Sequence, residues 1–200
     1  MSTENANINF ENNFSDEGPK ISFLEAFYGI IFMPGKIFDE LQKEETFTIF
    51  VYGVLAVLLS NLGKLDIGWI NPLSVIGIEF VGFLSWFFVG ILIFFLSTVF
   101  KSPNNNLGRL LGYTGLSSLP FLLLSPLALI ASMASLEWAS WIYFFFQSVV
   151  NIWSFILFWI ALAKCFQLEA WRVLLMAIIP FLLGIFLFTF LIANLLGMLF

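Results

Sequence analysis

Long apolar stretches separated by charged residues set the pattern of this chain. Charged side chains are costly at the centre of a bilayer, so the charges mark where each stretch ends. A helix needs about 20 apolar residues to cross the hydrocarbon core. The first stretch, Phe47–Gly63, is at the short end of the range with 17 uncharged residues. The pattern predicts an all-α integral membrane protein with a bundle of five transmembrane helices, at about 47–65, 77–99, 110–133, 139–163 and 173–196.

The second span requires a choice, because the stretch between Asp66 and Lys101 is too long for one span and too short for two. Residues 68–72, Gly-Trp-Ile-Asn-Pro, are typical of a turn. We therefore expect the span to begin near residue 77. This start puts Glu79 in the first helical turn, near the headgroups, where the helix dipole favours a carboxylate.

Residues 21–45, called the lead-in below, predict two short amphipathic cytoplasmic helices. Ser22 and Glu25 have the spacing of a capping box, and Pro34 ends one helix or begins the next. Such a segment lies in the membrane interface or packs on the cytoplasmic end of the bundle, and the sequence favours neither. Its apolar side chains are candidate contacts for a partner or the membrane: Phe23, Phe27, Ile37, Phe38 and Leu41.

Composition supports a membrane class and divides the chain into three parts. Hydrophobic residues make up 60% of the chain and charged residues 10%, whereas soluble domains carry about 25% charged residues. Residues 1–20 are polar and acidic and predict a disordered N-terminus. The lead-in follows, and residues 46–200 form the predicted transmembrane domain.

The positions of the basic residues predict the orientation. Seven of the eight Lys and Arg residues fall in segments on the same side as the N-terminus, and only Lys64 falls on the other side. Because cytoplasmic loops are enriched in Lys and Arg, we expect the N-terminus in the cytoplasm and the C-terminus outside.

Few residues suited to chemistry are present. The chain has no histidine and one cysteine, Cys165, so no ordinary zinc, haem or Ser–His pattern occurs. We expect no catalytic residues, no cofactor and no metal, and the net charge of −5 argues against nucleic acid as a partner. The acidic pair Glu44 and Glu45 indicates a solvated face. A transporter or channel component with a path near the proline-interrupted helices, at Pro120, Pro126 and Pro180, stays an alternative.

Small and aromatic residues indicate how the helices pack. Gly108 and Gly112 have G-x-x-x-G spacing, and Gly115 extends the small face. Packing within the chain is favoured over a dimer seam, so a homo-oligomer remains open. The aromatic residues between Trp138 and Phe146 are typical of a belt at the outer membrane interface.

Three segments resemble the Yip1 domain family over about residues 21–197. They are 32–41, Phe-Met-Pro-Gly-Lys-Ile-Phe-Asp-Glu-Leu; 111–120, Leu-Gly-Tyr-Thr-Gly-Leu-Ser-Ser-Leu-Pro; and 153–170, which leads into a proline-bearing last span. The most characteristic feature is the Gly-Tyr pair followed by a proline, here Gly112, Tyr113 and Pro120. The resemblance implies a packing role for these three residues.

The family resemblance implies a five-span membrane protein with a cytoplasmic N-terminus and no established catalytic activity. Eukaryotic members are associated with Golgi and vesicle traffic and with Rab-type GTPases, and they carry a D-L-x-G-P motif. Residues 16–19, Asp-Glu-Gly-Pro, only approximate that motif. The compact chain looks more like the prokaryotic members, which implies a cell (inner) membrane, with the ER or Golgi membrane as the alternative. The implied partners are the lipid bilayer and membrane or cytoplasmic proteins.

Overall fold

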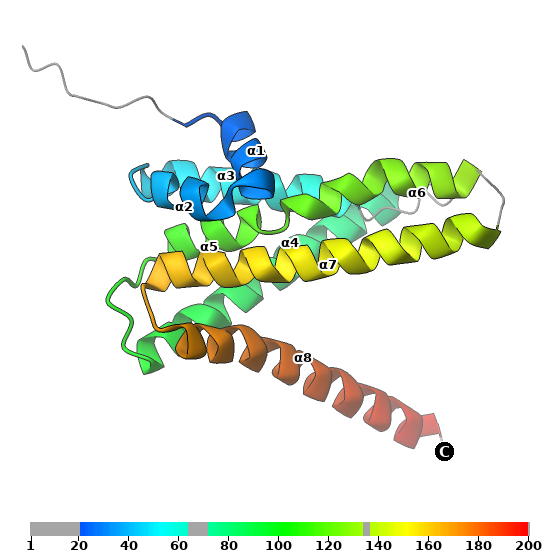
Figure 1. The fold of residues 1–200 in the computed structure, drawn as a ribbon. Coiled ribbons are helices and arrows are strands. Elements are labelled where there is room, and N and C mark those ends of the chain that lie inside the picture. Colours follow the sequence, from blue (N-terminus) through cyan, green and yellow to red (C-terminus); the bar gives the residue numbers. More distant parts are fainter. Residues whose placement is uncertain (1–20, 64–71, 134–136, 200) are drawn as a thin grey trace, which may run out of the picture.

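The structure, a computed structural model, describes residues 21–63, 72–133 and 137–199, and every element in these ranges is a helix. The expected disorder of residues 1–20 lies outside them. The lead-in forms α1 (Phe23–Phe32) and α2 (Pro34–Leu41), and the long helices are α3 (Thr46–Leu62), α4 (Pro72–Val99), α7 (Glu137–Phe166) and α8 (Ala170–Leu199). Between α4 and α7 lie α5 (Leu107–Leu116), the 3-10 helix η2 (Leu119–Leu123) and α6 (Leu124–Met133). In Figure 1, α1 lies across the long helices and α8 diverges from α7 toward the C-terminus.

Among the described residues, three helical segments are long and apolar enough to cross a membrane: Val75–Val99, Leu107–Ile130 and Trp141–Phe166. The apolar helices Thr46–Leu62 and Ala170–Phe186 are shorter. At 1.5 Å per residue, the 17 residues of α3 reach about 26 Å, slightly less than a typical hydrocarbon core of about 30 Å. The chain is thus an all-helical membrane protein, whereas the first and last spans remain predictions.

The third predicted span, 110–133, is not one continuous α-helix. Helix α5 ends at Leu116, and η2, with Pro120 in its first turn, precedes α6. A proline has no N–H to donate, and its ring collides with the carbonyl four residues earlier. That carbonyl belongs to Leu116, so the α-helix stops at the position that Pro120 dictates.

The second predicted span also needs a correction. Helix α4 begins at Pro72, a residue well suited to a first turn, so Glu79 is the eighth residue of the helix and not a first-turn residue. The Nδ2 atom of Asn61 on α3 donates to Oε2 of Glu79 over 3.4 Å. The carboxylate therefore faces a neighbouring helix instead of serving the free backbone donors at the start of α4.

Helices α3 and α5 run parallel and approach each other backbone to backbone. A Cβ atom added to Gly53 would lie 2.5 Å from Cα of Gly112, and one added to Gly115 would lie 2.5 Å from the carbonyl oxygen of Gly53. Real side chains do not tolerate such distances, so glycine is required on both helices. The small face predicted around Gly112 and Gly115 is thus used for packing within the chain.

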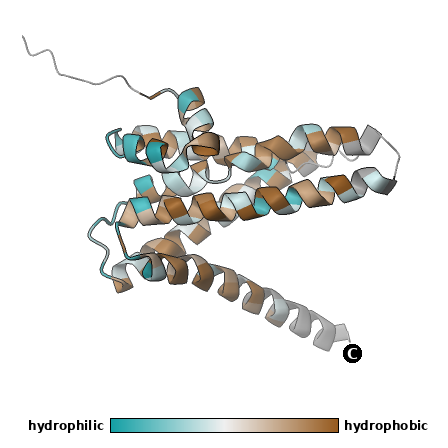
Figure 2. Cartoon of the chain, viewed as in Figure 1, coloured by the Kyte–Doolittle hydropathy of each residue, from teal (hydrophilic) through white to brown (hydrophobic). Residues whose placement is uncertain are grey.

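Polar residues gather at one end of the bundle, called the polar end below. Figure 2 shows them on α2 and on the connections that follow α4 and α7, while the middles of the helices are apolar. Hydrogen bonds join these segments: Oγ of Ser102, after α4, donates to the carbonyl of Phe166 at the end of α7. The described basic residues therefore share one end: Lys36, Lys43, Lys101, Arg109, Lys164 and Arg172.

The glycine contact predicts that a Gly→Ala substitution destabilises the protein at the contact and not at an open glycine elsewhere. Gly112→Ala should destabilise the protein by about 1–3 kcal/mol, because the added methyl must push α3 and α5 apart. The midpoint of thermal unfolding in mild detergent measures the effect. Gly77→Ala is the matched control, since a Cβ at Gly77 meets nothing within 4 Å and alanine suits a helix. Equal midpoints for the two variants would contradict the close contact.

Candidate functional site at the polar end

The lead-in starts with a helix cap and with two hydrogen bonds that attach Ile21 to other parts of the protein. The predicted capping box is complete: Oγ of Ser22 accepts from the Glu25 amide at 3.3 Å, and Oε2 of Glu25 accepts from the Ser22 amide at 3.4 Å. The residue before it is fixed to the rest of the protein. The amide of Ile21 donates to Oε1 of Glu44 over 2.9 Å, and the Tyr52 hydroxyl donates to the Ile21 carbonyl over 2.7 Å. The beginning of α1 is thereby tied to α3.

Helices α1 and α2 fold back on each other at a close contact. A Cβ on Gly29 would lie 2.8 Å from Cγ1 of Ile37, so only glycine lets the two helices approach this far. Ala26 and Ile30 of α1 are fully buried in the same apolar core as Ile37. Of the two alternatives for the lead-in, packing on the bundle therefore holds for this face.

Phe38 and Tyr113 form the central contact between the lead-in and the bundle. Both side chains are fully buried, and their ring centroids lie 5.1 Å apart. The Tyr113 hydroxyl donates to the Phe38 carbonyl over 3.2 Å. This carbonyl is among the last four of α2, which lack partners within an ideal helix. One side chain of α5 thus fills a gap in the core and caps α2.

A second polar contact ties α2 to α7. Nζ of Lys164 lies 2.6 and 2.7 Å from the two carboxylate oxygens of Asp39, and Nε2 of Gln42 donates to the Lys164 carbonyl over 3.0 Å. The two charged side chains are 35% and 56% exposed, so solvent screening keeps the energy of the ion pair small. Its effect is chiefly to fix the direction of α2 relative to α7.

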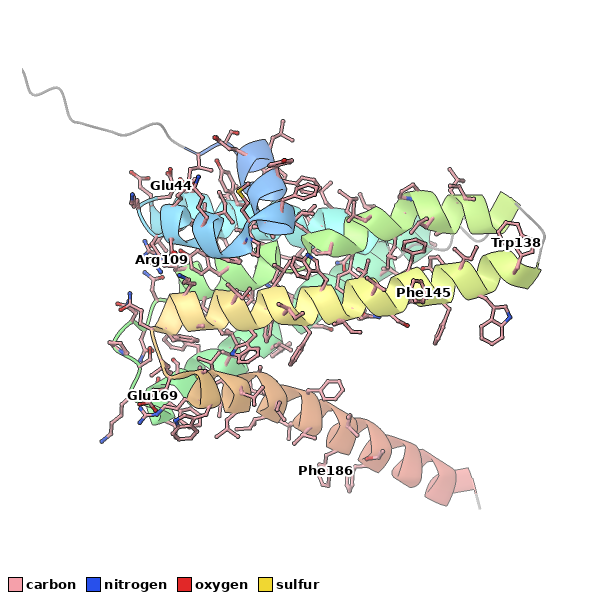
Figure 3. The ribbon with its side chains drawn as sticks, in the orientation of Figure 1. Glu44, Arg109, Trp138, Phe145, Glu169 and Phe186 are labelled. Carbon is pink, nitrogen blue, oxygen red and sulfur yellow. The ribbon has the colours of Figure 1, made fainter. Side chains whose placement is uncertain are left out.

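Arg109 completes the attachment from the start of α5. Its Nη2 donates to the Glu44 carbonyl over 3.1 Å, at the turn between the lead-in and α3. Asn106, which caps α5, also donates through Nδ2 to Oγ1 of Thr46 over 3.3 Å. Figure 3 shows Glu44 and Arg109 close together at the polar end, with Trp138 at the opposite end of α7.

The structure assigns different environments to the residues singled out from the sequence. Phe23 and Phe27 are partly buried against the core, whereas Ile37, Phe38 and Leu41 lie inside it. In this arrangement the last three contact the protein itself and offer no surface to a partner. The family-motif residues all have packing positions: Gly112 against α3, Tyr113 against α2, and Pro120 buried at the start of η2.

An exposed apolar face on α1 was not singled out from the sequence. It consists of three residues one helical turn apart and the C-cap residue that follows them, with exposed fractions between 55% and 76%, and is called the α1 outer face: Leu24, Tyr28, Phe32 and Met33. The i, i+4, i+8 spacing of the first three is visible in the sequence and places them on one face of a helix. It was missed because the other stripe of α1 is equally apolar, so α1 has two apolar faces.

Within the described residues, several polar side chains bond to the backbone of their own helices. No group of three His, Cys, Asp or Glu side chains there is able to hold a metal ion. The hydroxyls of Ser60, Thr114 and Ser117 donate to carbonyls of their own helices. A hydroxyl bonded in this way gives no support to a polar transport path.

These features define a helical membrane protein whose lead-in is attached to the bundle. The Yip1 domain model matches residues 28–191, which is most of the chain. The chain therefore belongs to the Yip1 domain family. Two of the segments that carry the resemblance, 32–41 and 111–120, meet at the contact between Phe38 and Tyr113. Comparisons with curated proteins and with solved structures yield no match.

The capping role of Tyr113 gives a testable consequence. Tyr113→Phe keeps the ring but removes the donor to the Phe38 carbonyl, so it should destabilise the attachment of α2 by about 1 kcal/mol. Amide hydrogen exchange across residues 34–44 should become faster by about fivefold at 25 °C. Tyr28→Phe makes the same chemical change at an exposed position and should alter nothing. An unchanged rate of amide exchange in Tyr113→Phe would contradict the capping role.

Proposed function

We propose that this Yip1-family protein is a non-enzymatic scaffold with five membrane spans that acts through protein partners at its polar end. The observation that carries the proposal is the attachment of the lead-in. Contacts from α3, α5 and α7 hold α1 and α2 in one position. A segment built only to connect a polar tail to the first span needs no such set of contacts.

The surface offered by the attached lead-in supports a role in binding. Helix α2 keeps its apolar side chains inside and its charged residues, such as Lys36 and Asp39, outside. Helix α1 adds its outer face beside them. Apolar side chains bordered by charges are the usual composition of a protein-binding surface. Tyr28 and Phe32 are the two aromatic residues best suited to act as anchors.

The orientation belongs to the same proposal. With the polar end in the cytoplasm, the described basic residues lie on the side that the positive-inside rule assigns to them. Trp138, Trp141 and Phe145 are exposed at the other end of α7, where an aromatic belt at the outer interface is expected. The shorter helices α3 and α8 then serve as the first and last spans, with the C-terminus outside.

Cysteine labelling tests the orientation, but the burial of the native cysteine means that cysteines have to be introduced at exposed positions. Cys165 is buried, so an impermeant thiol reagent should not modify it from either side before denaturation. In a Cys165→Ser background, Lys43→Cys should be labelled only after lysis of bacterial cells that express the protein. Trp138→Cys should be labelled in the intact cells. The reverse pattern would invert the proposed orientation.

The α1 outer face provides the test of partner binding. Tyr28→Ser combined with Phe32→Ser should strongly reduce the recovery of proteins crosslinked in the native membrane, because it removes both aromatic anchors. Both side chains are exposed, so the fold should be retained. Quantitative mass spectrometry of the crosslinked material measures the loss.

Two controls make the partner experiment decisive. Phe144→Ser combined with Phe145→Ser makes an equivalent change among exposed aromatic residues of α7, toward the opposite end, and should leave recovery unchanged. Size-exclusion chromatography in detergent verifies the fold of each variant. If the folded Tyr28/Phe32 variant still captures every protein captured by the parent, the scaffold proposal is wrong.

A further inference from the structure

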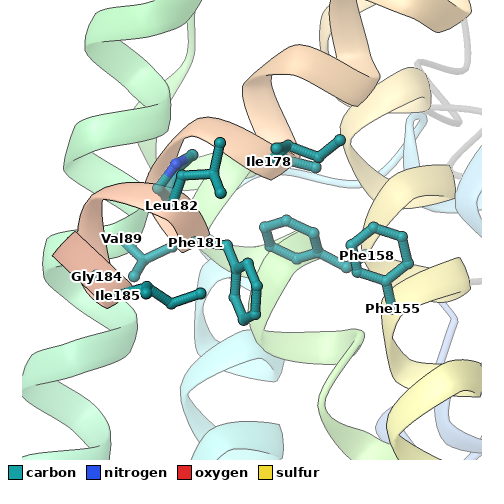
Figure 4. A pocket seen from close by; sticks show the side chains of 10 residues that line it. Val89, Phe155, Phe158, Ile178, Phe181, Leu182, Gly184 and Ile185 are labelled. Carbon is teal, nitrogen blue, oxygen red and sulfur yellow. The ribbon is translucent and has the colours of Figure 1, made fainter. Parts of the chain in front are cut away.

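A groove of about 870 Å³ lies between α4, α7 and α8. Figure 4 shows its wall, with Val89 from α4, Phe155 and Phe158 from α7, and Ile178 to Ile185 from α8. Every side chain that lines it is apolar. The volume is within the range of sites that bind small molecules, and the wall favours an apolar occupant such as a hydrocarbon chain.

The groove opens sideways, toward the lipid that surrounds a membrane bundle. Phe181 and Leu182 are 69% and 57% exposed, although both line the groove. At Gly184 an added Cβ would meet nothing within 4 Å, so α8 presents bare backbone there. A hydrocarbon chain is able to enter between α7 and α8 without passing through water.

The depth of the groove matches one leaflet of the bilayer. Its α8 residues, 177–185, follow Arg172 by 5 to 13 positions, which is about 8–20 Å along the helix at 1.5 Å per residue. Val89 precedes Lys101 by 12 positions, or about 18 Å. Half of a typical hydrocarbon core is about 15 Å. The groove therefore covers the depth of the lipid tails in the leaflet on the polar side.

Basic groups lie above the groove at the level of the headgroups. Lys101 follows the last turn of α4, and Arg172 is in the first turn of α8, where the helix dipole adds positive potential. Arg172 lies 5.3 Å from the centre of the Trp171 ring, and its Nε is 3.5 Å from Oε2 of Glu169. Glu169 also accepts from Nε1 of Trp171 over 2.6 Å. Two cations and one carboxylate leave a net positive charge at this level.

We propose that the groove is a binding site for one acyl chain of an anionic phospholipid, whose phosphate lies near Arg172 and Lys101. Bulk lipid tails are as apolar as the groove, so the hydrophobic effect does not select an occupant. Selection comes instead from van der Waals contact with the aromatic wall and from attraction of the headgroup to the basic residues. The site is separate from the lead-in and goes beyond the proposed scaffold role.

Photocrosslinking with a defined lipid tests the site. The full-length protein is placed in phosphatidylcholine nanodiscs that contain phosphatidylglycerol with a diazirine in its acyl chain. After illumination, peptide mass spectrometry should find the label concentrated on residues 155–158 and 177–185. A tryptophan in Gly184→Trp fills the groove and should remove most of this label. Gly77→Trp, at an equally open glycine on α4, should leave the label in place.

The headgroup is tested by competition between lipids. Arg172→Gln should reduce the preference for phosphatidylglycerol over phosphatidylcholine at the groove by about fivefold, which corresponds to about 1 kcal/mol per basic residue at a membrane surface. An unchanged preference overturns the anionic assignment. Label spread evenly over exposed α4 residues overturns the site.

The same measurement separates this proposal from the scaffold role. The Tyr28/Phe32 variant should keep full labelling of the groove, because the α1 outer face and the groove share no residue. Loss of partners with retained lipid label supports both proposals. Loss of partners with an unlabelled groove in both the parent and this variant overturns the lipid site and leaves the scaffold role standing. Retention of partners with a labelled groove overturns the scaffold role alone.

Discussion

The contact between Gly53 on α3 and the Gly112–Gly115 face of α5 is the constraint on which the other contacts depend. Two parallel helices meet backbone to backbone, at a distance that excludes any side chain. In lipid, where apolar burial gives no driving force between helices, such close packing supplies the van der Waals energy of association. Because α3 covers one face of α5 this tightly, every residue from Leu110 to Leu116 is buried, and the remaining faces receive α4, α7 and the lead-in.

Tyr113 shows how this central helix determines the polar end. It follows Gly112 directly and so leaves α5 on a different face from the glycine contact. From there it fills the space under α2 and caps the Phe38 carbonyl. The family pattern of a Gly-Tyr pair followed by a proline then has a physical basis: close approach to α3, attachment of the lead-in, and an end to the α-helix four residues before Pro120.

Much of the local structure could be predicted from the sequence, because it depends on residues close together in the chain. The capping box at Ser22 and the start of α2 at Pro34 follow from short-range backbone chemistry. The small face around Gly112 could also be predicted from the sequence. Its partner Gly53 could not, because nothing local indicates which helix will pack there. For the same reason, the sequence left open whether Phe38 faces the membrane or the bundle. The span at 110–133 was predicted from apolarity, with Pro120 as an interruption, but the sequence did not show that the interruption takes the form of the 3-10 helix Leu119–Leu123.

The burial of α5 also has a consequence for how the protein is made. Helix α5 has only 10 residues, among them Arg109, three glycines, a tyrosine and a threonine, so it is too short to cross a membrane by itself. It packs instead against α3, which leaves the ribosome earlier and carries the matching Gly53. Membrane insertion of α5 thus depends on packing against α3. Helix α3 has to remain near the insertion site, with its glycine face uncovered, until α5 is inserted.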